Sequence, residues 1–220
     1  VDQNDIPILA IIDAEMMLSM PKSLTAATGM DALTHAIEGY TTKAAWSLTD
    51  MFALQSISMI SKSLKKVVDE SNDIQARDVM ATAQYIAGMG FLNVGLGLVH
   101  GMAHPLGAFY DIPHGFANAL LLPYIMEYNM EGCIKKYKDI AIAMGAEVSK
   151  LSDFEAANVA VTMVKNLAIS VNIPQHLEDL GVKEEELEAL AIAAYSDVCT
   201  PGNPKTTSIE DILRIYRKAF

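Results

Sequence analysis

Four of the five histidines in the 220-residue chain lie in two short stretches, in arrangements that could bind a metal ion. In the first stretch, Asp31 precedes His35 by four residues. In the second, His100 precedes His104 by four residues, and His114 follows in an Ile-Pro-His-Gly segment. Side chains four residues apart on a helix project from the same face. The spacing therefore predicts a metal site built from one carboxylate and two or three imidazoles.

Neutral imidazole and carboxylate donors favour borderline divalent cations such as Zn²⁺ and Fe²⁺ over Mg²⁺ and Ca²⁺, which prefer oxygen ligands. Three histidines and one aspartate leave room for a further ligand at Fe²⁺, or at Zn²⁺ if its coordination expands. A catalytic Lewis acid requires such an open position. Spacing alone leaves open which three or four residues bind, and whether some of these histidines are hydrogen-bonded core residues instead.

Two further residues allow more than one interpretation. Glu38, three residues after His35, could orient a metal ligand, but a glutamate at such a position more often pairs with a lysine or faces water. Cys199 lies in a loop beside an Asn-Pro segment and could be a reactive thiol. The expectation for it is an ordinary buried cysteine.

The elements that must position these residues are predicted to be helices. Residues 21–220 have helical periodicity almost throughout, and the only convincing strand covers residues 6–12. The prediction is one all-α, bundle-like domain of about eight helices over residues 21–220, with at most one short strand, inside a linker segment over residues 1–20. The predicted helices begin at residue 21 and continue as 48–68 with Ser47 as N-cap, 73–90, the segment of His100, 115–128 with a break expected at Pro123, 135–144, 152–170, 183–197 and 208–220.

Composition excludes several classes of function. The formal net charge of −11 argues against a surface that binds nucleic acid or an anionic membrane. The longest apolar stretch, residues 116–126, is too short to span a bilayer, and the first residues lack a basic signal-peptide region. Two cysteines far apart give no disulfide framework and fit a reducing compartment. The expected location is the cytoplasm.

At the histidine-bearing stretches the sequence resembles a known family. The string from Gly29 to Tyr40, which contains Asp31 and His35, resembles the metal motif of the iron-containing (group III) alcohol dehydrogenases. The string from Gly95 to Gly115 resembles the second signature of the same family. The resemblance continues through the Cys-Thr-Pro-Gly-Asn-Pro segment at 199–204 to the C-terminus, so it covers nearly the whole chain.

The resemblance implies a role for each residue of the two motifs. Asp31, His35, His100 and His114 match the four metal ligands of the family, whose metal is Fe²⁺ with Zn²⁺ as a possible substitute. His104 matches a histidine beside the metal that is not a ligand and lies near the nicotinamide and the substrate. An ordinary pKa near neutrality suits that histidine to proton transfer.

The resemblance also implies a second domain that this chain does not contain. Family members bind NAD(H) through an N-terminal α/β domain with a glycine-rich turn, and no such turn occurs here. The glycines between Gly88 and Gly107 have neither a preceding strand nor phosphate-loop spacing. They are expected to be helix breaks or close-packing points. The chain is thus expected to be the C-terminal helical domain of a longer enzyme, inactive by itself and part of a homodimer in its full-length form.

Three functions remain open from the sequence. The first, implied by the resemblance, is hydride transfer between NAD(H) and a short aldehyde or vicinal diol, such as lactaldehyde or 1,2-propanediol, with the metal polarising the substrate oxygen. The second is a helical metal-binding module without redox turnover. The third is a metal-dependent hydrolase with His104 as the base, although no dedicated nucleophile or substrate signature supports it.

Overall fold

A computed structural model describes residues 7–220, which form eight α-helices and several short 3-10 helices and contain no strand. This confirms the predicted all-α class. The first 3-10 helix, η2, covers Ala14–Met17. The α-helices are α1 (Lys22–Thr41), α2 (Ser47–Asp69), α3 (Ile74–Val94), α4 (Leu98–Tyr110), α5 (His114–Ala143), α6 (Asp153–Ser170), α7 (Leu187–Tyr195) and α8 (Ile209–Ala219).

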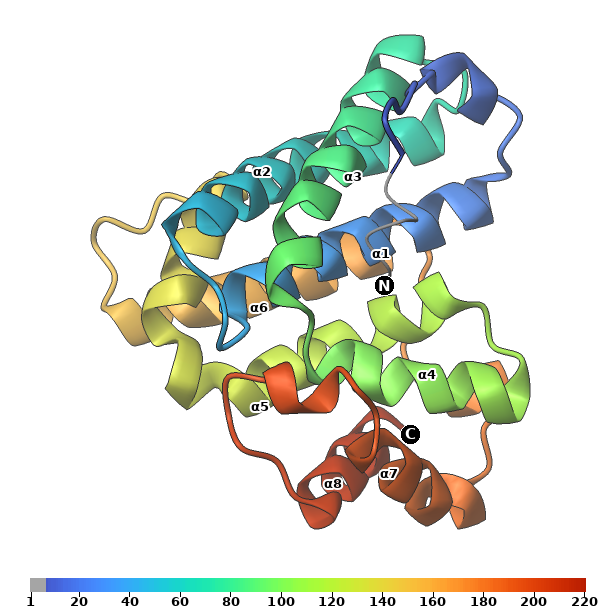
Figure 1. Cartoon of the computed structure of the whole chain (residues 1–220), viewed down its shortest axis with the longest axis vertical. Coiled ribbons are helices and arrows are strands. Elements are labelled where there is room, and N and C mark those ends of the chain that lie inside the picture. Colours follow the sequence, from blue (N-terminus) through green and yellow to red (C-terminus); the bar gives the residue numbers. More distant parts are fainter. Residues whose placement is uncertain (1–6) are drawn as a thin grey trace.

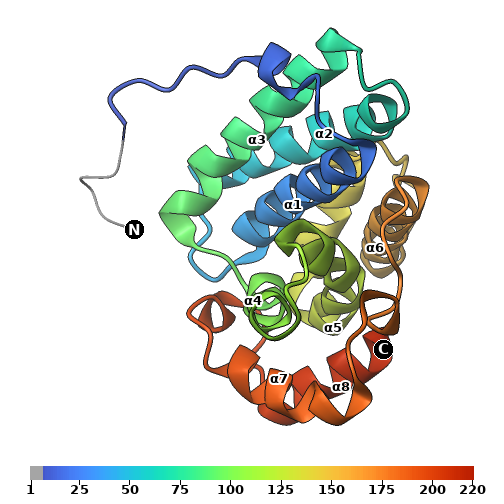
Figure 2. The same cartoon turned by 90° about the vertical axis from the view of Figure 1, so that its right-hand side faces the viewer.

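The helix α1 lies at the centre of one half of the molecule, where it packs against α2, α3 and α5. The long helix α5 joins this half to the rest, because it also contacts α4, α6 and α8. In Figures 1 and 2 the helices α7 and α8 lie below α4 and α5, on the side away from α2 and α3. The three helices that carry the histidine motifs, α1, α4 and α5, therefore meet in the interior.

The helix ends show why most predicted boundaries were close. Ser152 and Ser208 each cap a helix by accepting a hydrogen bond from the backbone three residues later, as expected for serine at an N-cap. The predicted cap at Ser47 was wrong by one residue. There the N-cap is Trp46, whose backbone N–H donates to Thr49 Oγ1 at 3.1 Å.

Two helices predicted over residues 115–128 and 135–144 are a single helix, α5, of 30 residues. Pro123 lies inside it and is buried, and its neighbours Leu121 and Leu122 are fully buried. A proline in a helix interior costs about 3 kcal/mol, and burial of apolar side chains around it can offset that cost. Gly132 also continues the helix. Its backbone is not in the left-handed conformation that commonly ends a helix at glycine.

The sequence predicts at most one short strand, over residues 6–12, and none forms in the part of this segment that the structure describes. Residue 6 lies outside the described residues, and residues 7–12 form no strand. Their apolar side chains, such as Ile8 and Ile11, are exposed. A strand needs a partner for its backbone hydrogen bonds, and residues 7–220 offer no other strand.

The buried apolar side chains of the helices form one continuous core that includes residues from α1 to α8. Within residues 7–220, no single helix is long and apolar enough to cross a membrane. The helices α3 and α4 pass that test only as a pair, and they are bent by 102° at the break between them.

Candidate metal centre

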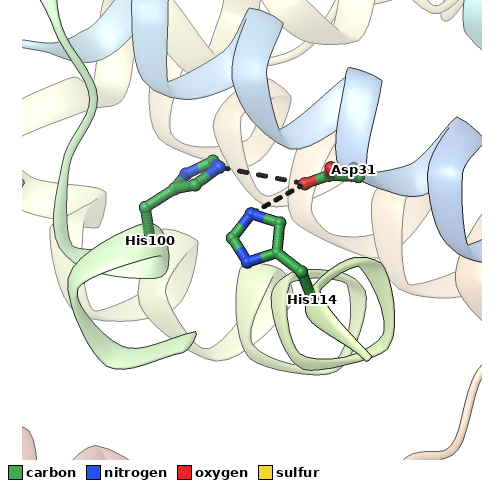
Figure 3. Close-up of side chains that lie close together, drawn as sticks. All are labelled: Asp31, His100 and His114. Carbon is green, nitrogen blue, oxygen red and sulfur yellow. Dashed lines mark ion pairs between the residues drawn. The ribbon is translucent and has the colours of Figure 1, made fainter. Parts of the chain in front are cut away.

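The predicted ligands come from three helices that converge on one point. Asp31 and His35 project from successive turns of α1, His100 lies in the first turn of α4, and His114 is the first residue of α5. Figure 3 shows the side chains of Asp31, His100 and His114 directed toward one another. Their donor atoms all lie within 4.8 Å of one another, which makes them a candidate metal site.

The distances around this point fit a single small cation. Asp31 Oδ1 lies 3.7 Å from His114 Nε2, 3.8 Å from His100 Nε2 and 3.9 Å from His35 Nδ1. His35 Nε2 lies 3.1 Å from His100 Nε2. Donors about 2.0–2.3 Å from one ion lie about 3–4 Å from one another, and Asp31, His100 and His114 form such a group. His35 is not part of that group, because it approaches Asp31 through Nδ1 and His100 through Nε2. The donor set, three imidazoles and a carboxylate, suits Zn²⁺ or Fe²⁺.

Burial favours the neutral, metal-binding form of His35 and His114. The His100 side chain is only 2% exposed, whereas that of His114 is 43% exposed. Burial lowers the pKa of His35 to about 4, against the opposing effect of Asp31. Burial also lowers the pKa of His114, and again Asp31 acts in the opposite direction. A neutral imidazole offers a lone pair on one ring nitrogen, so both residues are available as ligands near neutral pH.

The expectation for Glu38, a lysine partner or contact with water, was wrong. Its carboxylate is buried and lies 2.6 Å from His100 Nδ1, and it accepts a backbone hydrogen bond from Val99 at 2.6 Å. Gly97 permits this approach, because a Cβ there would lie 2.9 Å from Glu38 Oε1. A carboxylate behind a ligating histidine fixes its ring and tautomer, so His100 Nε2 faces the candidate metal position.

His104 lies beside the four predicted ligands rather than among them. Its ring stacks on that of His114 with centroids 5.5 Å apart, and its Nδ1 lies 2.8 Å from Asp197 Oδ2. Asp197 was missed by the sequence analysis, since it lies 93 residues from His104 in the segment after α7, where no local pattern marks it. The carboxylate orients the imidazole ring through Nδ1.

Cys199 belongs to a second group of possible donors, together with His104 and Asp197. The Cys199 backbone N–H donates to Asp197 Oδ1 at 2.8 Å. Burial, with a further contribution from Asp197, raises the pKa of the Cys199 thiol to about 12. A thiol with so high a pKa is a poor nucleophile near neutral pH. The raised pKa thus favours an unreactive thiol, although Cys199 is only partly buried and not buried as expected.

Asn118 is a further residue that the sequence analysis missed. Its side-chain nitrogen Nδ2 lies 2.7 Å from Asp31 Oδ1, 2.9 Å from His114 Nε2 and 3.2 Å from His100 Nε2. The available signal was its position four residues after His114, on the same helix face.

A cavity of about 340 Å³ adjoins the site between α1, α3 and η2. Asp31 and His35 form part of its wall, and Phe91 stacks on the His35 ring with centroids 4.3 Å apart. The remaining lining is mostly apolar, with methionines at 17, 20 and 80. A cavity of this size and character suits a small organic molecule.

The glycines between Gly88 and Gly107 do not form a phosphate-binding turn in the structure. Gly95 ends α3 with a positive φ of 79°, a conformation that glycine adopts readily. Gly97 allows Glu38 to approach α4, as described above. The expected helix break and close-packing point are confirmed at these two positions.

The chain is similar to several known alcohol dehydrogenases. Residues 25–220 match the model of the C-terminal part of the Fe-containing alcohol dehydrogenase family. The chain is 55% identical over 220 residues to lactaldehyde reductase of Escherichia coli K12 and 44% identical to 1,3-propanediol dehydrogenase of Klebsiella pneumoniae, in each case over its whole length. It spans 57% of the length of each of these relatives.

A solved structure supports the same relationship. The crystal structure of a 1,3-propanediol oxidoreductase matches this fold with a TM-score of 0.94 at 45% sequence identity. The match covers 94% of this chain and 55% of that chain. The chain therefore belongs to the Fe-containing alcohol dehydrogenase family and corresponds to the helical C-terminal part of its members.

Proposed function

We propose that this chain is the metal-bearing half of an NAD(H)-dependent oxidoreductase that interconverts a short aldehyde and its alcohol. The observation that carries the proposal is the convergence of Asp31, His100 and His114, with His35 beside His100, next to a small, mostly apolar cavity. These four residues would hold one Fe²⁺, or Zn²⁺ in its place. When bound, the ion supplies a Lewis acid that polarises the substrate oxygen and lowers the pKa of the alcohol.

The remaining steps belong to side chains of the chain itself. His104, held at Nδ1 by Asp197, is placed to exchange a proton at Nε2 with the substrate side of the site. Glu38 keeps His100 Nε2 directed toward the ligand cluster. Phe91 and Met80 supply apolar lining on the cavity side of the site, against which the carbon chain of a short aldehyde would pack.

Lactaldehyde and 1,2-propanediol are the proposed substrate pair, and similarity to lactaldehyde reductase supports this choice. The chain spans only 57% of that relative, so we propose that a domain outside this chain binds NAD(H). The homodimer implied by the family resemblance remains a prediction.

The test is an absorbance assay at the NADH band with the chain joined to its dinucleotide-binding domain and loaded with Fe²⁺ or Zn²⁺. We expect oxidation of NADH with lactaldehyde, and loss of that activity in His114→Ala. The matched control is His176→Ala, because His176 is exposed and is not among the site residues. Absence of NADH oxidation in the metal-loaded protein, or ester hydrolysis without nicotinamide, would contradict the proposal.

A further inference from the structure

Asn118 is the one fully buried amide that faces the candidate metal ligands in the described part of the chain. It lies on α5, one turn after His114, and its side chain is inaccessible to solvent. Its Nδ2 contacts donor atoms of Asp31, His100 and His114, the same three residues whose donors form the candidate metal group. One nitrogen therefore faces three atoms that could otherwise bind a cation.

The hydrogen-bonding capacity of the amide does not match this environment. An amide nitrogen carries two N–H donors, so it can satisfy at most two of the three acceptors. Asn118 Oδ1 is buried and has no hydrogen-bond partner among the described residues. Leaving a buried polar atom unpaired costs about 1–3 kcal/mol, so the arrangement needs a physical reason.

The environment of the three acceptors is suited to a positive charge. His100 directs its Nδ1 toward the buried Glu38 carboxylate, which leaves the Nε2 lone pair facing Asn118. Asp31 adds a carboxylate oxygen at 2.7 Å from the amide nitrogen. The positively polarised N–H groups of Asn118 thus lie where these lone pairs converge, and they cannot share the same lone pairs with a cation.

We propose that Asn118 is a further residue of the metal centre and presents its side-chain oxygen to a bound cation. A half-turn about the Cβ–Cγ bond exchanges the nitrogen and the oxygen without moving α5, since the two groups have nearly the same size and shape. The exchange removes the N–H groups from the cation and gives Oδ1 a partner, while the amide nitrogen takes the buried position that Oδ1 leaves. Amide oxygens are hard donors that a borderline divalent ion accepts beside imidazole and carboxylate. This inference rests on the proposed function only in requiring that a divalent ion binds.

The test compares two substitutions that separate the oxygen from the nitrogen. Asn118→Asp keeps an oxygen toward the site and removes both N–H donors, whereas Asn118→Leu has a similar size and keeps neither. The probe is Co²⁺, added to the full chain, with affinity measured by competition against a chromophoric chelator. The visible absorption of bound Co²⁺ reports its donor set and coordination number. Asn129→Leu is the matched control, because Asn129 is also a buried amide of α5 but bonds to Asn203, away from the site.

We expect Asn118→Leu to bind Co²⁺ at least tenfold more weakly with a changed spectrum, Asn118→Asp to bind at least as tightly as the wild type, and Asn129→Leu to bind normally. Equal affinity and an unchanged spectrum in Asn118→Leu would overturn the inference. Equal weakening in Asn118→Asp and Asn118→Leu would also overturn it, because the nitrogen would then be the group that matters. If Asn118→Leu does not fold, the spectrum of Asn118→Asp decides, since a carboxylate facing Co²⁺ must alter it and an unchanged spectrum overturns the inference.

The same titration separates this inference from the proposed function. If the wild type binds Co²⁺ and Asn118→Leu binds it with the same affinity and spectrum, only the proposed role of Asn118 is refuted. Failure of the wild type to bind Co²⁺ would remove the proposed function and the role of Asn118 together.

Discussion

At the scale of single residues, the orientation of each imidazole decides whether the centre can bind an ion. His100 is the most buried of the candidate ligands, and its ring is fixed by the Glu38 carboxylate at 2.6 Å. The contact holds the proton on Nδ1 and leaves Nε2 as a donor toward the centre. Glu38 therefore contributes to metal affinity without a direct place in the ligand cluster.

Replacing Glu38 by Gln tests this role. The variant keeps the size of the side chain but removes the charge that stabilises the ring orientation of His100. Metal affinity should fall by about 10–100-fold, as measured by Zn²⁺ competition with a chelator. Glu188→Gln, at an exposed position on α7, is the control and should bind normally. Unchanged affinity in Glu38→Gln would show that His100 is oriented by packing alone.

The lowered pKa of His35 predicts how stability depends on pH in the presence of a chelator. Burial lowers this pKa to about 4 in the folded chain, whereas an unfolded histidine has a pKa near 6.5. Between these values the unfolded chain binds more protons than the folded chain. The contribution of His35 to the free energy of unfolding is therefore complete above about pH 6.5 and declines as pH falls toward 4. The free energy of unfolding, measured with urea for the wild type and His35→Asn between pH 4 and 7, should fall more steeply with decreasing pH in the wild type than in the variant. A difference independent of pH would contradict the assignment.

At the scale of elements, the site requires α1 and α5 to approach closely. Gly115 makes this possible, because a Cβ at this position would lie 2.6 Å from the backbone oxygen of Ala27. The glycine sits next to His114 at the start of α5, opposite the segment of α1 that leads to Asp31. Any added atom there should push His114 away from Asp31.

Gly115→Ala should therefore destabilise the fold by about 1–3 kcal/mol and weaken metal binding as well. Gly132→Ala on the same helix is the control, since no atom of the described chain lies within 4 Å of its added Cβ. That substitution should raise stability by about 0.4–1 kcal/mol, because alanine restricts the unfolded chain. Chemical unfolding and Zn²⁺ titration of both variants provide the measurement. Equal stability and equal Zn²⁺ affinity of the two variants would refute the proposed close contact between Gly115 and Ala27.

The elements also show what the sequence could and could not predict. Local signals sufficed where the cause is local, as for the helix caps at Ser152 and Ser208. They failed for α5, because Pro123 is tolerated only through tertiary packing that sequence periodicity does not reveal. They failed for residues 7–12 as well, because apolar content predicted a strand without information about a pairing partner.

The same distinction between local and long-range causes applies to the candidate site. The pairs Asp31/His35 and His100/His104 follow from helical spacing, and Asn118 could have been found from its position one turn after His114. Spacing alone did not separate His104 from the ligands; the family resemblance did, and the structure places it against Asp197. The contact with Asp197 joins parts of the chain 93 residues apart, so only the folded chain reveals it.

At the scale of the whole molecule, residues 7–220 supply the predicted metal ligands and a cavity, and they contain no recognised nucleotide-binding turn. Hydride transfer requires the nicotinamide and the reacting carbon within about 3–3.5 Å, and this positioning accounts for a large part of the rate. The 220-residue chain alone should therefore reduce lactaldehyde with NADH at least about a hundredfold more slowly than the chain joined to its proposed dinucleotide-binding domain. Steady-state NADH assays on both forms, each with equal metal content, measure this difference. Comparable rates would refute the proposed division of labour.

The central claim is that Asp31, His35, His100 and His114 bind one divalent ion. Its most direct test is an anomalous difference map, recorded at the zinc absorption edge from crystals of the chain grown with stoichiometric Zn²⁺. We expect a single strong peak among these four side chains, at about 2.0–2.3 Å from their donor atoms. A peak instead at His104, Asp197 and Cys199, the other group of possible donors, or no peak at the four predicted ligands, would contradict it.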